Sequence, residues 1–306
     1  MQNETRQIKY KKLVWHDIIN PNEEIINSLA KKYRFHHLAV EDCLSRVERP
    51  KIDEYTNHLL IILHFPVYNE STLIVRETEL KIFIGQNFFI TLHDGSLKFL
   101  DKVYAECQNF HDKKEYLGKG TGYFLYEIVF GLLKNCFPIL DKLRAHMREL
   151  EKDIFENERI KDLLHDLMIV KKNIITLRRT ISPQRAVIAS LEHKNQKFLP
   201  ENLELYFDDV VDHVEKIWSA LEGLKETIEA LESTNESVIT HRTNDVMRIF
   251  TTVTVLLMPP TLIASFFGMN THLPFAKEEL TFWIIVIVMI IIPGAMLGYF
   301  KHKEWL

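Results

Sequence analysis

The residues most able to do chemistry are uncharged oxygen donors that recur in a row near the C-terminal end of the chain. They follow one another every three or four positions: Asn244, Met247, Thr251, Thr254, Met258, Thr261, Ser265 and Gly268. At 3.6 residues per turn, this spacing places all of them on one face of a helix. Amide and hydroxyl oxygens accept hydrogen bonds from water, and Mg²⁺ gives up its water ligands reluctantly. We therefore expect this polar stripe to suit a hydrated divalent cation, and we note that no carboxylate interrupts it.

Small and hydroxylated residues also line ordinary helix–helix contacts in lipid, which is the alternative interpretation of the stripe. The residues between its members are apolar, for example Val253, Leu256 and Leu262. The chain has one further apolar run, and that run has no complementary polar face. The stripe would then have to meet copies of itself, and rings of identical residues around an axis form a pore.

Two uncharged segments could hold these residues in a membrane. Neither residues 249–276 nor residues 280–300 contain Asp, Glu, Lys or Arg. About 20 apolar residues cross the hydrocarbon core of a bilayer, so the sequence predicts transmembrane helices at 248–269 and 280–300. Two buried helices of a soluble bundle are the alternative, but the second run has no polar face.

Flanking charges predict the orientation of these spans. Arg242 and Arg248 precede the first, and Lys301 and Lys303 follow the second, in a basic tail at 301–306. The excess of positive charge on the cytoplasmic side places both termini in the cytoplasm and the loop 270–279 outside. The beginning of the chain has no apolar stretch typical of a signal peptide. Cys43, Cys107 and Cys136 form no CxxC pair, as expected for free thiols in a reducing cytosol.

The remaining chain predicts a cytoplasmic α/β domain at 1–120, a helical hairpin at 121–200 and a stalk helix at 201–247 that continues into the first span. Strands are expected at 58–67, 79–84 and 87–92, and Asn20-Pro21-Asn22-Glu23 is typical of a helix start, with Asn20 as the cap. Two long amphipathic helices are expected at 124–155 and 162–181. An apolar seam lines the stalk: Ile217, Leu221, Leu224, Ile228 and Leu231.

Other chemistry is sparse in the sequence. Asp208, Asp209 and Asp212 form an acidic cluster with His213, for which a solvated surface is the alternative to metal binding. The remaining histidines are too scattered to build a closed metal site. A Walker loop, a GxGxxG motif and a nucleophile elbow are all missing from the sequence. We therefore expect no enzyme, no organic cofactor and no nucleic-acid partner.

The end of the first span, Gly268-Met269-Asn270, resembles the CorA metal-ion transporter family. The resemblance extends through TNDVMRIFTTVTVLLMPPTLIASFFGMN and the tail KHKEWL, and through EDCLSRVERPKIDEY and YFDDVVDH in the cytoplasmic part. It implies a funnel-shaped homopentamer in the cell membrane, with the first span lining the pore. It also implies a selectivity ring at Gly268, Met269 and Asn270, and it matches family pore positions to Asn244, Met247, Met258 and Thr261.

The resemblance further implies that Asp209 binds regulatory Mg²⁺ between subunits, with weaker cases for Asp208 and Asp212. Glu278 and Glu279 of the outer loop would concentrate cations. The expected function is import of Mg²⁺, and of Co²⁺ or Ni²⁺, gated by intracellular Mg²⁺.

Some residues depart from the family pattern. Ser265 replaces a glycine, Phe250 replaces a leucine, and the outer loop lacks the MPEL sequence. These departures leave open the alternative that the protein is a proton-coupled zinc transporter of the ZntB-like branch. A two-span membrane sensor or scaffold is the alternative from another class, but it does not explain the polar stripe.

Overall fold

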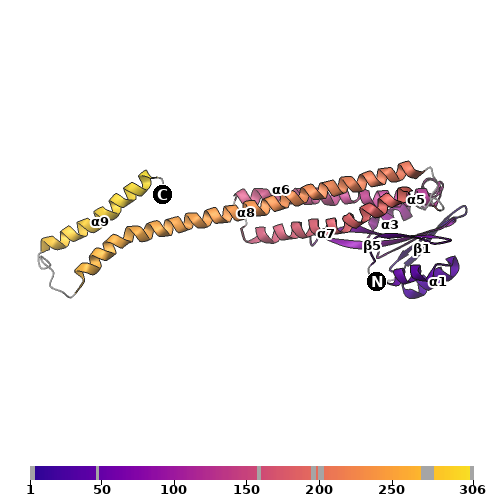
Figure 1. Cartoon of the computed structure of the whole chain (residues 1–306), viewed down its shortest axis with the longest axis horizontal. Coiled ribbons are helices and arrows are strands. Elements are labelled where there is room, and N and C mark those ends of the chain that lie inside the picture. Colours follow the sequence, from indigo (N-terminus) through magenta and orange to yellow (C-terminus); the bar gives the residue numbers. More distant parts are fainter. Residues whose placement is uncertain are drawn as a thin grey trace. The chain divides into compact units, whose positions relative to one another are not determined.

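The structure is a computed structural model that describes residues 4–45, 48–156, 160–193, 198, 203–269 and 279–303. The chain forms two compact units, Met1–Leu231 and Glu232–Leu306. Figure 1 follows the chain through both units from indigo to yellow.

The first unit is built on one six-stranded sheet in the order β1-β2-β6-β5-β4-β3. Its strands are β1 (Glu4–Tyr10), β2 (Leu13–Ile19), β3 (Lys51–Glu54), β4 (Leu59–Asn69), β5 (Ile74–Ile84) and β6 (Phe88–His93). Only the β2–β6 pair is parallel. The expected strands at 58–67, 79–84 and 87–92 correspond to β4, part of β5 and β6.

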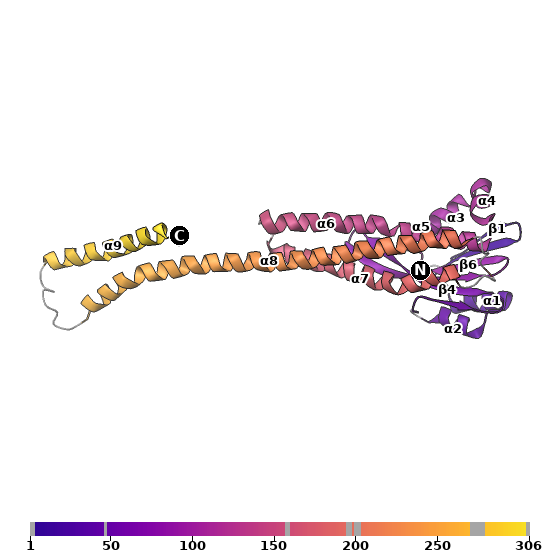
Figure 2. The same cartoon turned by 45° about the horizontal axis from the view of Figure 1, so that its top comes forward.

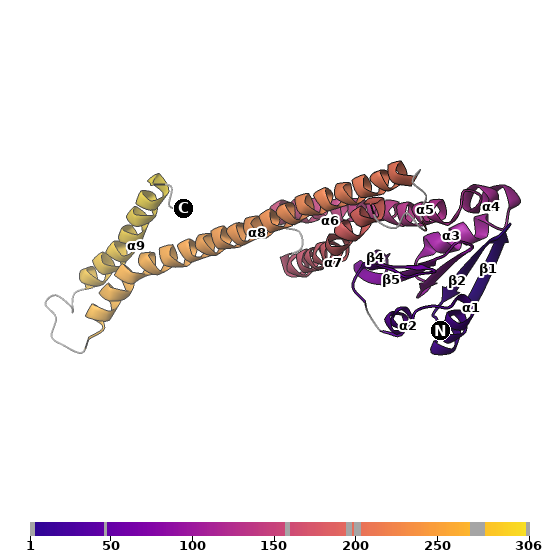
Figure 3. The same cartoon turned by 45° about the vertical axis from the view of Figure 1, so that its right-hand side comes forward.

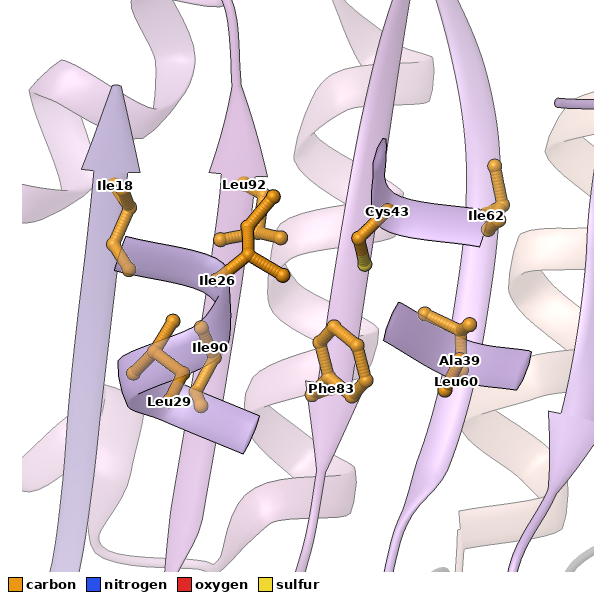
Figure 4. Close-up of a cluster of buried hydrophobic side chains, with 10 residues drawn as sticks. All are labelled: Ile18, Ile26, Leu29, Ala39, Cys43, Leu60, Ile62, Phe83, Ile90 and Leu92. Carbon is orange, nitrogen blue, oxygen red and sulfur yellow. The ribbon is translucent and has the colours of Figure 1, made fainter. Parts of the chain in front are cut away.

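Two short helices, α1 (Glu23–Tyr33) and α2 (His37–Leu44), cover one face of this sheet, as Figure 3 shows. Alternate residues of the central strands point toward them, because side chains alternate between the two faces of a strand. Figure 4 shows the resulting core, in which Ile26, Leu29, Ala39 and Cys43 from the helices lie over Ile18, Leu60, Ile62, Phe83, Ile90 and Leu92 from four strands.

The start of α1 differs from the prediction by two residues. The capping side chain belongs to Asn22, whose Oδ1 accepts a 2.9 Å hydrogen bond from the backbone N–H of Ile25. Asn20 instead has a left-handed backbone (φ 51°) and donates its N–H to the carbonyl of His93. The cap therefore follows Pro21, and the helix begins at Glu23.

The opposite face of the sheet packs against α3 (Lys98–Glu106), α4 (Phe110–Leu117) and α5 (Thr121–Lys134). Phe124 of α5 makes edge-to-face contacts with Trp15 and Phe89, at centroid distances of 4.9 and 4.7 Å. The Trp15 indole N–H donates to the Thr91 hydroxyl at 3.0 Å, so its polar atom is satisfied inside the core.

Long helices complete the first unit: α6 (Cys136–Glu156), α7 (Ile160–His193) and the first part of α8 (Glu204–Phe267). In Figures 1 and 2 these segments lie side by side, and ion pairs join Arg178 to Glu222 and Arg185 to Glu215 between α7 and α8. The seam predicted along the stalk is confirmed as buried, from Ile217 to Leu231.

The helix predicted at 124–155 is wrong as a single element, because α5 ends at Lys134 and α6 begins at Cys136. Pro138 explains the break. It has no N–H to donate to the carbonyl of Lys134, and its ring crowds that carbonyl, whereas both features are tolerated in the first turn of a new helix.

In the second unit, α8 continues to Phe267 and α9 spans Glu279–His302. Among the described residues, three helical segments are long and apolar enough to cross a membrane: Thr121–Phe155, Glu204–Phe267 and Leu280–His302. The first has most of its apolar stretch buried, which explains why hydropathy alone is misleading there. The apolar stretches of the other two are entirely unburied within the chain.

Candidate functional site

The polar stripe is carried by one continuous helix, α8, from Asn244 to Ser265, and Gly268 follows its last residue. Every stripe member is exposed in the single chain, and Met247 and Met258 are 59% and 70% exposed. At about 100° per residue, the members span roughly a third of the helix circumference. The expected face therefore exists as a continuous surface.

Two of the three stripe threonines, Thr254 and Thr261, present acceptors rather than donors to this surface. The hydroxyl of Thr254 donates to the carbonyl of Phe250 at 2.8 Å, and that of Thr261 donates to the carbonyl of Leu257 at 2.7 Å. A hydroxyl has one proton, so each oxygen keeps its lone pairs for an outside donor. Water bound to a cation points its hydrogens outward, and such oxygens are suited to accept them.

On the other side of this part of α8, the residues that follow Arg248 are mostly apolar, and several of them are exposed. Ile249, Val253 and Phe266 are 56%, 49% and 59% exposed. Contiguous apolar surface on this scale requires lipid or another protein surface to cover it. The helix thus separates a polar face from a face that only lipid or protein can cover.

Two prolines, Pro259 and Pro260, lie inside α8 next to the stripe. Proline cannot donate the helical hydrogen bond, so the carbonyls of Val255 and Leu256 lose their normal i+4 donors.

The predicted selectivity residues are only partly described. Gly268 directly follows α8 and donates its N–H to the carbonyl of Ala264 at 2.9 Å, and Met269 is 53% exposed. Asn270 and Glu278 lie outside the described residues. Glu279 is the first residue of α9, and its side chain is likewise not described.

The acidic cluster lies near the start of α8, in the first unit. Asp208 and Asp212 are exposed, whereas the side chain of Asp209 is 46% exposed and lies between two neighbours. His213 donates from Nδ1 to the carbonyl of Asp209 at 2.8 Å, and its ring packs on Phe130. Asp209 therefore differs from the other two carboxylates in being held in place.

Tyr126 of α5 is the neighbour of Asp209 that sequence reasoning missed. Burial and the charge of Asp209, to which its hydroxyl is hydrogen-bonded, raise the pKa of Tyr126 to about 12. The two residues are 83 positions apart in the sequence. The spacing of residues along the sequence cannot predict a contact between residues so far apart.

The fold and the α8 surface together define a class of protein: a soluble-type α/β domain joined to apolar helices that suit a membrane. The family model described as "CorA-like Mg2+ transporter protein" matches residues 10–302. The chain belongs to this family.

Three similar proteins extend the comparison. The cobalt/magnesium transport protein CorA of Thermotoga maritima is 25% identical over 92% of this chain and 80% of its own length. The magnesium transport protein CorA of Helicobacter pylori (strain 26695) is 26% identical over 98% of this chain and 92% of its own length. The complete structure of the CorA magnesium transporter of Methanocaldococcus jannaschii superimposes with a TM-score of 0.85 at 22% identity, over 98% of this chain and 94% of that chain.

Proposed function

We propose that this protein is a divalent-cation channel or transporter of the membrane that imports Mg²⁺ and also accepts Co²⁺ or Ni²⁺. The observation that carries the proposal is the acceptor surface of α8, where hydroxyl oxygens keep their lone pairs for outside donors. The printed names of the relatives, magnesium and cobalt/magnesium transport proteins, support the choice of ion. They do not favour the proton-coupled zinc carrier.

The pore requires several copies of the chain. In our proposal the stripe residues Asn244, Met247, Thr251, Thr254, Met258, Thr261 and Ser265 face the axis of a homopentamer, and the apolar faces of α8 and α9 meet lipid. Gly268, Met269 and Asn270 form the outer entrance, where the Asn270 amide accepts hydrogen bonds from the hydration shell. Glu278 and Glu279 raise the local cation concentration by attraction. Both termini lie in the cytoplasm.

Transport then needs no chemical energy source. An inside-negative potential contributes about 2.3 kcal/mol per charge per 100 mV, so a divalent ion gains about 4.6 kcal/mol. Since a tenfold concentration ratio corresponds to about 1.4 kcal/mol, this potential supports roughly a thousandfold accumulation. We accordingly propose passive import.

Regulation is assigned to the acidic cluster. Asp209 binds regulatory Mg²⁺ at the contact between neighbouring subunits, and the exposed Asp208 and Asp212 contribute less. Carboxylates brought together in this way repel one another unless a divalent ion bridges them. Intracellular Mg²⁺ thereby favours the closed arrangement of the assembly through its higher affinity for that state.

The first prediction tests transport in liposomes. We expect voltage-driven Mg²⁺ uptake that the Asn270→Ala substitution abolishes, because the outer ring loses its acceptors. Asn270→Asp is expected to retain binding but to slow uptake, since a carboxylate holds the ion more tightly. A dye that reports internal Mg²⁺ measures both, with voltage and pH gradients imposed separately.

The matched control is Asn235→Ala, an amide on the face of α8 opposite the stripe, and its uptake should equal that of the wild type. Zinc uptake that follows a proton gradient, without Mg²⁺ uptake, would contradict the proposal. The absence of any ion flux would favour the sensor or scaffold.

A further inference from the structure

A second polar site lies in the first unit, on elements other than α8. A cavity of about 1280 Å³ is lined by His64 of β4 and by Glu77, Glu79 and Lys81 of β5. The strand register pairs His64 directly with Glu79, and Glu77 is two residues earlier on the same strand face. Three potential ligand side chains thus share one side of one strand pair.

The sheet face changes from apolar to charged near this cavity. Along β5 the residues on this face run from Phe83, which belongs to the core under α1 and α2, to Lys81, Glu79 and Glu77. Burial of charged groups costs free energy unless they are paired or bind a partner. Glu77 and Glu79 are half-buried beside the buried His64, so these groups need partners that offset the cost of their burial.

His64 is held in one tautomer by Glu77. Its Nδ1 donates to Oε1 of Glu77, while Oε2 of the same carboxylate lies 3.8 Å from the Arg179 guanidinium on α7. With the proton on Nδ1, the Nε2 atom carries the lone pair. The His64 side chain is 6% exposed, and Nε2 is buried without a hydrogen-bond partner among the described residues. The Nε2 lone pair is therefore available to a ligand that enters the cavity.

Glu79 lies on the Nε2 side of the ring. Its Oε1 is 4.0 Å from His64 Nε2, and its Oε2 is 3.3 Å from the Lys81 ammonium. Lys81 is itself fixed by the carbonyls of Asp42 and Cys43, at 2.9 and 3.3 Å. The lysine therefore orients one oxygen of Glu79. The other, Oε1, accepts a 3.2 Å hydrogen bond from the backbone N–H of Glu48 and keeps a second lone pair for a further partner.

We propose that His64 Nε2 and Glu79 Oε1 bind a divalent transition-metal ion such as Zn²⁺, with cavity water completing its coordination. Zinc takes ligands at about 2.0–2.2 Å, so a tetrahedral ion needs its two ligand atoms about 3.4 Å apart. The observed separation of 4.0 Å is wider, so the Glu79 side chain must move toward the imidazole when the ion binds. Glu77 acts as the orienting acceptor on the far nitrogen, as carboxylates commonly do behind metal-bound histidines.

The ligand chemistry separates this site from the one proposed for Mg²⁺. Imidazole suits Zn²⁺, Co²⁺ and Ni²⁺, whereas Mg²⁺ prefers oxygen ligands only. The alternative interpretation of the same geometry is a protonated His64 that forms ion pairs with Glu77 and Glu79. In that state Nε2 has no lone pair to give to a metal. Because binding is measured without flux, its outcome is independent of the transport proposal.

The test uses the full chain in detergent, stripped of metal, and titrated with Zn²⁺ by calorimetry in a large excess of Mg²⁺ that fills oxygen-only sites. We expect one Zn²⁺ per chain, and X-ray absorption of the bound zinc should show a single imidazole nitrogen. His64→Gln and Glu79→Gln should each lose this binding. Glu77→Ala should weaken it by about 10- to 100-fold.

His165→Gln is the matched control, because His165 is an exposed histidine on α7 and its loss should leave zinc binding unchanged. Circular dichroism of each metal-free variant checks that it folds. Wild-type protein that takes up no zinc under these conditions overturns the proposal regardless of any variant. Unchanged affinity in folded His64→Gln does so as well.

Discussion

His58 shows how a single buried side chain makes this protein sensitive to pH. It is fully buried, its ring lies 5.0 Å from that of Phe35, and its Nδ1 is 2.7 Å from Oδ1 of Asn57. Burial, with a smaller effect from the charge of His36, lowers the pKa of His58 to about 4. Burial similarly lowers the pKa of His16 to about 4.

The second prediction follows from these pKa values. Between pH 6.5 and about 4, these histidines are neutral in the folded chain and protonated in the unfolded chain. The unfolded state then binds more protons, so stability decreases as the pH falls through this window. We expect His58→Gln to remove up to about 3 kcal/mol of this decrease.

Thermal unfolding of the full chain at pH 7 and at pH 4.5 measures the effect. His58→Gln should narrow the difference between the two melting temperatures, whereas the exposed His111→Gln should not. An identical difference in wild type and His58→Gln would show that His58 does not carry the pH dependence.

Residue-level prediction from the sequence can identify a surface whose members follow local helical spacing. The stripe from Asn244 to Ser265 repeats within one helix, so its common face can be found without a structure. The contacts of Asp209 with Tyr126, and of His64 with Glu77, join separate elements. They depend on how the elements pack, which no spacing in the sequence records.

At the scale of the element, α8 combines two surfaces along one continuous helix. The buried seam from Ile217 to Leu231 serves the first unit, and the exposed stripe lies in the second. Both follow helical periodicity, and the sequence predicts both. The break at Asn135 was missed because the apolar pattern continues across it, and only the missing N–H of Pro138 marks the end of α5.

The third prediction concerns the two faces of α8. If the stripe lines water in the assembly, single cysteines on it should react with small polar thiol reagents much faster than cysteines on the apolar face. The stripe positions are Thr254, Met258, Thr261 and Ser265, and the comparison positions are Val255, Leu256 and Leu262.

The background for this experiment replaces the three native cysteines, Cys43, Cys107 and Cys136, all of which are buried. Reaction rates are measured on the reconstituted protein. Equal rates on the two faces would remove the basis for assigning a pore to the stripe.

At the scale of the whole molecule, our proposal is that further copies of the chain cover the exposed polar surface of α8. We expect native mass spectrometry of the detergent-solubilised protein to give five copies. Two or three copies would leave the stripe as a packed helix contact, which is the alternative interpretation of its small residues.

The fourth prediction concerns regulation in that assembly. Asp209→Ala should raise the internal Mg²⁺ concentration that half-inhibits uptake by about tenfold, the change expected when about 1.4 kcal/mol of state-dependent binding is lost. Conduction itself should persist, because Asp209 lies outside the stripe. Asp166→Ala, an exposed carboxylate on α7, is the control. An unchanged inhibition curve for Asp209→Ala would place the sensor elsewhere.

The contact between α7 and the strand β4 also affects how the chain avoids aggregation. β3 pairs with β4 only as far as Ile62, so the outer edge of β4 beyond that residue has no neighbouring strand. Gln184 of α7 replaces one there, accepting the N–H of His64 at 2.8 Å and donating to its carbonyl at 2.6 Å. An unpaired strand edge is a template for pairing with other chains. Until α7 docks, a newly made chain therefore exposes an edge to its neighbours, and Gln184 closes that edge when folding is complete.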